Sequence, residues 1–101
     1  MIERKEILAY LGSLKNYLRE NGIEKIGLFG SFADQKADEY SDIDIVIKTT
    51  PAFVKKYDGV TGFLFLEDLR RGIQNRFHRQ VDICDEAGLK NTAIIGGAIY
   101  A

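Results

Sequence analysis

Two aspartates separated by one residue are the feature of this sequence that most directly suggests chemistry. Asp42 and Asp44 lie in the segment DIDIVIK, where isoleucines alternate with other residues as in a strand with one buried face. Residues two apart on a strand share a face, which places the two α-carbons about 6.5–7 Å apart. Two carboxylates so placed repel each other unless a cation lies between them. Mg²⁺ is the expected cation, because it prefers oxygen ligands and keeps positions for water and phosphate.

A third carboxylate occurs in the later segment VDIC. Its alternation predicts a strand in which Val81 and Ile83 face the core and Asp82 faces away from it. If the two segments form neighbouring strands, Asp82 converges with Asp42 and Asp44. Three carboxylates can hold two metal ions about 3.5–4 Å apart, an arrangement that supports in-line phosphoryl displacement. The three aspartates are therefore candidates for both catalysis and metal binding.

A glycine–serine pair precedes the first acid by ten residues. Gly30 and Ser31 follow the short apolar run KIGLF, which predicts a buried strand that ends in a tight turn. Glycine lets the backbone approach a phosphate, and the N–H groups and hydroxyl of such a turn can bind it. Each feature alone is common at ordinary turns and on solvated strands. Their combination in one short stretch indicates a phosphate site beside a metal site.

The elements that must position these residues follow from apolar periodicity and turn signals. Helices are expected over residues 2–20 and 61–77 with a short piece over 32–37, and strands over 25–29, 42–48, 80–84 and near 98–100. Pro51 is expected to break the chain, and residues 52–60 are ambiguous. A further short helix is expected after residue 85. This order predicts an α/β (α+β) fold, a small mixed β-sheet flanked by helices, as a single domain over residues 1–101.

The composition restricts the partners. The chain has 14 Lys and Arg against 15 Asp and Glu, a net charge of −1. It lacks the excess of positive charge that sequence-independent binding of DNA or RNA requires, so nucleic acid is disfavoured. The N-terminal residues are charged where a signal peptide is apolar, and no apolar stretch approaches the ~20 residues of a membrane span. With Cys84 as the single cysteine, we expect a cytoplasmic protein without disulfides or membrane contact.

The motif as a whole resembles the signature of the DNA polymerase beta-type nucleotidyltransferase superfamily. Gly30–Ser31, ten intervening residues and Asp42-Ile43-Asp44 match its start, and Asp82 matches its third acid. Ser41 before the acidic pair and the short length resemble its minimal nucleotidyltransferase branch of MntA-like antitoxins. The resemblance implies the nucleotidyltransferase fold and Mg²⁺-dependent transfer of a nucleoside monophosphate, AMP from ATP, to a hydroxyl group.

The same resemblance assigns roles to residues. Asp42 and Asp44 would bind two Mg²⁺ ions, and Asp82 would complete the site and accept the proton of the attacking hydroxyl. Gly30 and Ser31 would hold the β- and γ-phosphates. Members of this branch are typically paired with a HEPN-type ribonuclease toxin, so the implied acceptor is a tyrosine of that toxin. The chain itself is too short to contain a separate acceptor-binding domain.

One departure from the family pattern leaves an alternative open. Asp34 and Gln35 stand where the branch often has Arg-Gly, and an aspartate would repel a triphosphate that an arginine would bind. Lys36 and Lys48 are candidate substitutes, although solvated surface charges are the commoner reading. The alternative is a catalytically inactive module of the same fold that neutralises its partner by contact. A tail-modifying RNA nucleotidyltransferase also fits the motif but conflicts with the pI of about 5.8.

Overall fold

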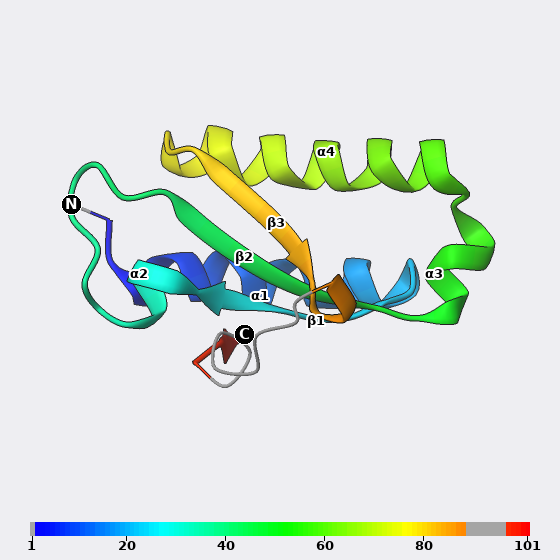
Figure 1. Cartoon of the computed structure of the whole chain (residues 1–101), viewed down its shortest axis with the longest axis horizontal. Coiled ribbons are helices and arrows are strands. Elements are labelled where there is room, and N and C mark those ends of the chain that lie inside the picture. Colours follow the sequence, from blue (N-terminus) through cyan, green and yellow to red (C-terminus); the bar gives the residue numbers. More distant parts are fainter. Residues whose placement is uncertain (1, 89–96) are drawn as a thin grey trace.

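The computed structural model describes residues 2–88 and 97–101 as a mixed sheet with helices on one face (Figure 1). Its elements are α1 (Arg4–Glu20), β1 (Ile23–Phe29), α2 (Gly30–Ala33), β2 (Ile43–Thr49), α3 (Pro51–Lys56), α4 (Gly59–Phe77), β3 (Val81–Asp85), the 3₁₀ turn η1 (Glu86–Gly88) and β4 (Ile99–Tyr100). The strand order is β3-β2-β1-β4. β1 is antiparallel to β2 and β4, whereas β2 and β3 are parallel. The predicted small mixed sheet is therefore confirmed.

The core lies between the sheet and the helices α1 and α4. The apolar stripe predicted for the first helix is confirmed, because Ile7, Leu11 and Leu18 are fully buried. They pack with the alternate β2 residues Ile43, Ile45 and Ile47, and with residues of α4 and β3. α1 packs on β1, and α4 packs on β3. One face of the sheet is thus covered by helices, and the acids of β2 and β3 point to the other face.

The parallel pairing of β2 and β3 depends on the connection through α3 and α4. Pro51 was expected to break the chain, but it begins α3, where a missing N–H costs nothing at the first helical position. α4 begins at Gly59, two residues before the predicted start. The reason is an N-cap at Asp58, whose carboxylate accepts a hydrogen bond of 3.0 Å from the Thr61 N–H.

The ends of other helices and strands differ by a few residues from those predicted from the sequence. α2 covers only Gly30–Ala33 and stops short of the predicted residue 37, because Gln35 adopts a left-handed conformation with φ 58°. The predicted terminal strand is confirmed as β4. The predicted short helix after residue 85 corresponds to η1, and the part of that prediction that falls on residues 89–96 lies outside the described residues. Across the described ranges, every helix is too short or too polar to span a bilayer.

Candidate active site

Asp44 and Asp82 lie side by side as register partners on the parallel strands β2 and β3. Each follows a fully buried core residue, Ile43 in β2 and Val81 in β3, so both carboxylates face away from the helices. Neighbouring strands lie about 4.8 Å apart, which brings the two aspartates within reach of one ligand. Asp42 immediately precedes β2. The condition on which the prediction depended, that the two acidic segments form neighbouring strands, is met.

The three acids repel one another. The pKa of Asp44 is raised above its ordinary value, first by burial and then by the negative charges of Asp82 and Asp42. Burial also raises the pKa of the Cys84 thiol on β3, and the charges of Asp82 and Asp44 raise it further. The ion pairs formed within residues 2–88 and 97–101 include none of the three aspartates. This edge of the sheet therefore holds negative charge that a cation would neutralise.

The donor set fits magnesium, although the side chains do not form a closed cage. Carboxylate oxygens are the ligands that Mg²⁺ prefers. In the part of the chain that the structure describes, no three acidic, histidine or cysteine side chains are arranged to hold a metal ion as they stand. Asp42 and Asp82 are exposed and Asp44 is half-buried, so rotation of exposed side chains can bring their oxygens together.

Gly30 joins the glycine–serine turn to this acidic group. It follows β1 directly and begins α2 with φ 70°, a left-handed conformation that favours glycine. The preceding residue, Phe29, is the register partner of Asp44. A Cβ built on Gly30 would clash with the Asp44 carboxylate and lie 3.2 Å from its Cγ. The half-exposed Ser31 comes next, so the predicted phosphate turn and the central acid are in direct contact.

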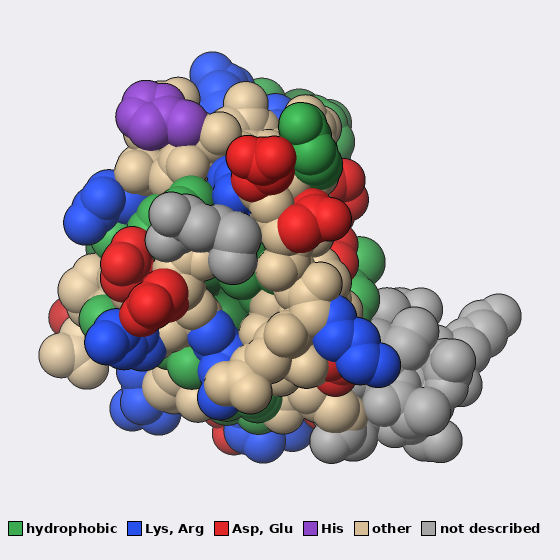
Figure 2. Space-filling model, turned by 90° about the vertical axis from the view of Figure 1, so that its left-hand side faces the viewer, with side chains coloured by type: hydrophobic (Ala, Val, Ile, Leu, Met, Phe, Trp, Pro, Cys, Tyr) green, Lys and Arg blue, Asp and Glu red, His purple; other side chains and the backbone are tan. Residues whose placement is uncertain are grey.

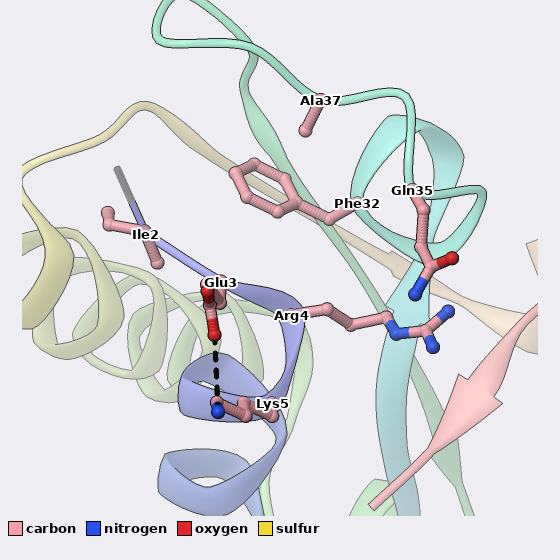
Figure 3. Close-up of a pocket in the computed structure, with 7 residues that line it drawn as sticks. All are labelled: Ile2, Glu3, Arg4, Lys5, Phe32, Gln35 and Ala37. Carbon is pink, nitrogen blue, oxygen red and sulfur yellow. Dashed lines mark ion pairs between the residues drawn. The ribbon is translucent and has the colours of Figure 1, made fainter.

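A cavity of about 490 Å³ lies away from this group, between the start of α1 and the end of α2 (Figure 3). Its lining consists of Ile2, Glu3, Arg4, Lys5, Phe32, Gln35 and Ala37. Arg4 extends from α1 toward α2, and its Nη1 donates a 2.9 Å hydrogen bond to the Ala33 carbonyl. Lys5 pairs with Glu3 at 3.4 Å. None of the five predicted site residues lines this cavity. It therefore lies between α1 and α2 and is separate from the three aspartates.

Comparison with known proteins decides the family. The model of the family described as polymerase beta, nucleotidyltransferase matches residues 12–98, which is most of the chain. The chain belongs to this nucleotidyltransferase family. The resemblance inferred from Gly30–Ser31, the aspartate pair and Asp82 is thereby confirmed at the level of the family.

Individual relatives point to the minimal branch. The nucleotidyltransferase is 28% identical over 92 residues to protein adenylyltransferase MntA of Thermococcus cleftensis, covering 90% of this chain and 85% of the relative. Its fold matches a solved minimal nucleotidyltransferase with a TM-score of 0.71 at 22% identity, over 97% of this chain and 95% of the other. A toxin–antitoxin structure with AMP-PNP gives a TM-score of 0.62 at 19% identity, and a mutant MntA–HpeT toxin–antitoxin structure gives 0.59 at 18%. Each of these two matches covers 89% of this chain and 70% of the other.

Asp34 and Gln35, the two residues directly after α2, include a glycine-like backbone conformation. Gln35 adopts the left-handed conformation, with φ 58°, that glycine enters without cost. Asp34 caps the end of α2 and is exposed. The end of α2 therefore has an exposed negative charge, where the family resemblance led us to expect an arginine.

Arg79 was not among the site residues predicted from the sequence. Its Nη1 donates hydrogen bonds to the Asp38 carbonyl at 3.0 Å and to the Ser41 carbonyl at 2.8 Å. Both acceptors are backbone atoms about forty positions earlier in the chain, so no pattern of side chains predicts the contact. The one available signal was its place three residues before Asp82.

Proposed function

We propose that this nucleotidyltransferase transfers AMP from ATP to a hydroxyl group of a partner protein, as an antitoxin that modifies its toxin. The observation that supports this most is the register pairing of Asp44 with Asp82, directly beside Gly30 and next to Asp42. That arrangement combines metal ligands with a turn that can receive phosphate. The related MntA is a protein adenylyltransferase, and a toxin–antitoxin structure of the same fold holds AMP-PNP.

The three aspartates would hold Mg²⁺, with two ions expected. When bound, the metal would neutralise the developing charge on the phosphate oxygens. Asp44 has the central place, because it contacts the glycine–serine turn on one side and pairs with Asp82 on the other. The mutant MntA–HpeT structure carries glutamates in place of two aspartates that are two positions apart, the spacing of Asp42 and Asp44.

The chain's own residues would divide the remaining work. Gly30 and Ser31 would hold the β- and γ-phosphates, because Gly30 begins α2 in a left-handed turn whose N–H groups and serine hydroxyl can donate to an anion. The acceptor hydroxyl would attack the α-phosphorus, the bond to pyrophosphate would break, and Asp82 would take the proton of the hydroxyl. Asp82 is suited to that step because its side chain is exposed at the sheet edge.

A protein is a better acceptor than a nucleic acid for this surface. Acidic and basic side chains are interspersed over the end of the molecule seen in Figure 2, without a broad basic area. The net charge of −1 agrees with that view. We propose a HEPN-type toxin as the partner and one of its tyrosines as the acceptor, following the branch to which the chain is similar.

The alternative function is neutralisation by contact without transfer. Asp34 favours it, because an exposed aspartate beside the glycine–serine turn would repel a triphosphate. The open arrangement of the three acids favours it as well.

A label-transfer assay separates the two functions. The protein is mixed with the product of the adjacent gene, ATP labelled on the α-phosphate, and Mg²⁺. Transfer requires that label reach the partner and that the double variant Asp42→Ala with Asp44→Ala abolish it. Asp68→Ala is the matched control, since Asp68 is exposed on α4 and pairs with Arg71 of the same helix. Neutralisation of the partner that persists in the double variant, without label, would establish the contact function instead.

A further inference from the structure

We propose that Arg79 is a positioning residue of the site, which holds the segment containing Asp42 against the strand containing Asp82. The inference rests on the proposed function, because it concerns the geometry of the proposed metal ligands. Arg79 lies between α4 and β3, directly after His78, the C-terminal residue that caps α4. It is half-buried, and its guanidinium lies over the segment that leads into β2.

The backbone of Asp42 is fixed on both sides by residues 79 and 80. The Ser41 carbonyl, which belongs to the peptide bond before Asp42, accepts the 2.8 Å hydrogen bond from Arg79. The N–H of Ile43, directly after Asp42, donates a 2.9 Å hydrogen bond to the Gln80 carbonyl. Since Asp82 lies in β3 two residues after Gln80, these contacts set the position of Asp42 relative to Asp82.

The segment that Arg79 holds is a closed turn of its own. The Asp38 carboxylate accepts hydrogen bonds from the Tyr40 N–H at 2.9 Å and the Ser41 hydroxyl at 3.1 Å. These bonds lower the pKa of Asp38, with the Tyr40 N–H as the largest cause and the Arg79 charge among the smaller ones. Arg79 also binds the Asp38 carbonyl at 3.0 Å. Arg79 therefore binds both ends of a hydrogen-bonded turn that leads directly into Asp42.

Arg79 reaches the glycine–serine side of the site as well. Its guanidinium lies 5.7 Å from the ring centroid of Phe32, a buried residue of α2. The Arg79 side chain thus contacts both α2, which begins at Gly30, and the turn before Asp42. The Arg79 backbone leads into the strand that contains Asp82. A flat guanidinium can stack on a ring and donate in several directions at once, which a lysine ammonium cannot do.

The test uses Arg79→Ala and Arg79→Gln, with Arg71→Ala as the control. Arg71 is an exposed arginine of α4 whose removal takes away the same charge without touching the turn. Two measurements need no transfer activity: Mn²⁺ binding followed by paramagnetic relaxation of water, and hydrogen exchange of the backbone amides of residues 40–43 in the metal-free protein. We expect both Arg79 variants to bind Mn²⁺ about tenfold more weakly, as for other groups that orient metal ligands. We also expect faster exchange at residues 40–43, with the amides of Leu11 and Leu18 in α1 unchanged.

Wild-type Mn²⁺ affinity and exchange in a folded Arg79 variant would overturn the proposal. Arg79→Gln keeps a polar side chain that is too short to reach both carbonyls, so it serves if Arg79→Ala does not fold. Failure of the proposed function would have a different signature. The unsubstituted protein would transfer no AMP and bind no Mn²⁺, and exchange at Asp42 and Ile43 in the Arg79 variants would then decide the positioning role alone.

Discussion

Replacing Gly30 by alanine should disable the site through one methyl group. Gly30 has φ 70°, where an L-residue with a Cβ is disfavoured by about 1–2 kcal/mol. The new Cβ would also collide with the Asp44 carboxylate. Because that carboxylate is the end of a side chain and not backbone, turning it away relieves the collision at a smaller cost in stability than a backbone clash. The rotation, however, removes the central ligand from Asp82 and from the expected metal.

The magnitudes differ for stability and for metal binding. A loss of about 1–2 kcal/mol lowers the Tm of a domain of this size by roughly 5–15 °C. Loss of the Asp44 orientation should weaken Mn²⁺ binding by at least about tenfold. Transfer of AMP should fall with it, since the proposed function depends on metal held by the three carboxylates.

Gly22→Ala is the matched control. Gly22 also has a positive φ, 90°, and a Cβ there would meet the Phe53 backbone, with its Cα at 2.7 Å. Backbone atoms cannot rotate aside, so this variant should be at least as unstable as Gly30→Ala while keeping its Mn²⁺ affinity. Thermal unfolding and Mn²⁺ titration of both variants provide the comparison. Equal Mn²⁺ affinities in the two folded variants would refute the contact between Gly30 and Asp44 as a determinant of the site.

Three further predictions follow from the same geometry. Asp44→Asn should raise the Tm of the metal-free protein at pH 7. The pKa of Asp44 is raised in the folded protein, so its charged form destabilises the fold above that pKa. Thermal unfolding measured at several pH values should show that the gain in Tm disappears near pH 4. Asp34→Arg should tighten AMP-PNP binding several-fold in calorimetry, and unchanged affinity would show that the end of α2 lies away from the phosphates. His78→Gly should stabilise the protein by about 1 kcal/mol in urea unfolding, because the exposed His78 ends α4 in the left-handed conformation; a loss of stability would indicate a contact that the histidine supplies.

The acids and the turn could be predicted because their signals are local. Alternation along β2 and β3 determines which side chains leave the core, so Asp44 and Asp82 were assigned to the open face from the sequence. The pairing of the two strands could be stated only as a condition, since nothing local specifies that Asp44 opposes Asp82. The contact of Gly30 with Asp44 likewise depends on strand register, which cannot be derived from the sequence alone.

The remaining differences have physical causes that lie far apart in the chain or in backbone dihedrals. Arg79 binds backbone carbonyl groups, and every residue has a backbone carbonyl group. The sequence therefore cannot indicate that its partners are those of Asp38 and Ser41. The early end of α2 depends on a left-handed Gln35, where glycine would have been the usual signal. Pro51 could equally break a chain or begin a helix, and the structure has it at the first position of α3.

Calorimetric titration of Mg²⁺ with AMP-PNP tests the central claim most directly. The claim is that Asp42, Asp44 and Asp82 form one metal and nucleotide site beside Gly30. The account predicts Mg²⁺-dependent heat of binding for the unsubstituted protein and for Asp68→Ala, and its loss in the Asp42→Ala, Asp44→Ala double variant and in Asp82→Ala. Binding that survives in the folded aspartate variants, or no binding by the unsubstituted protein, would contradict it.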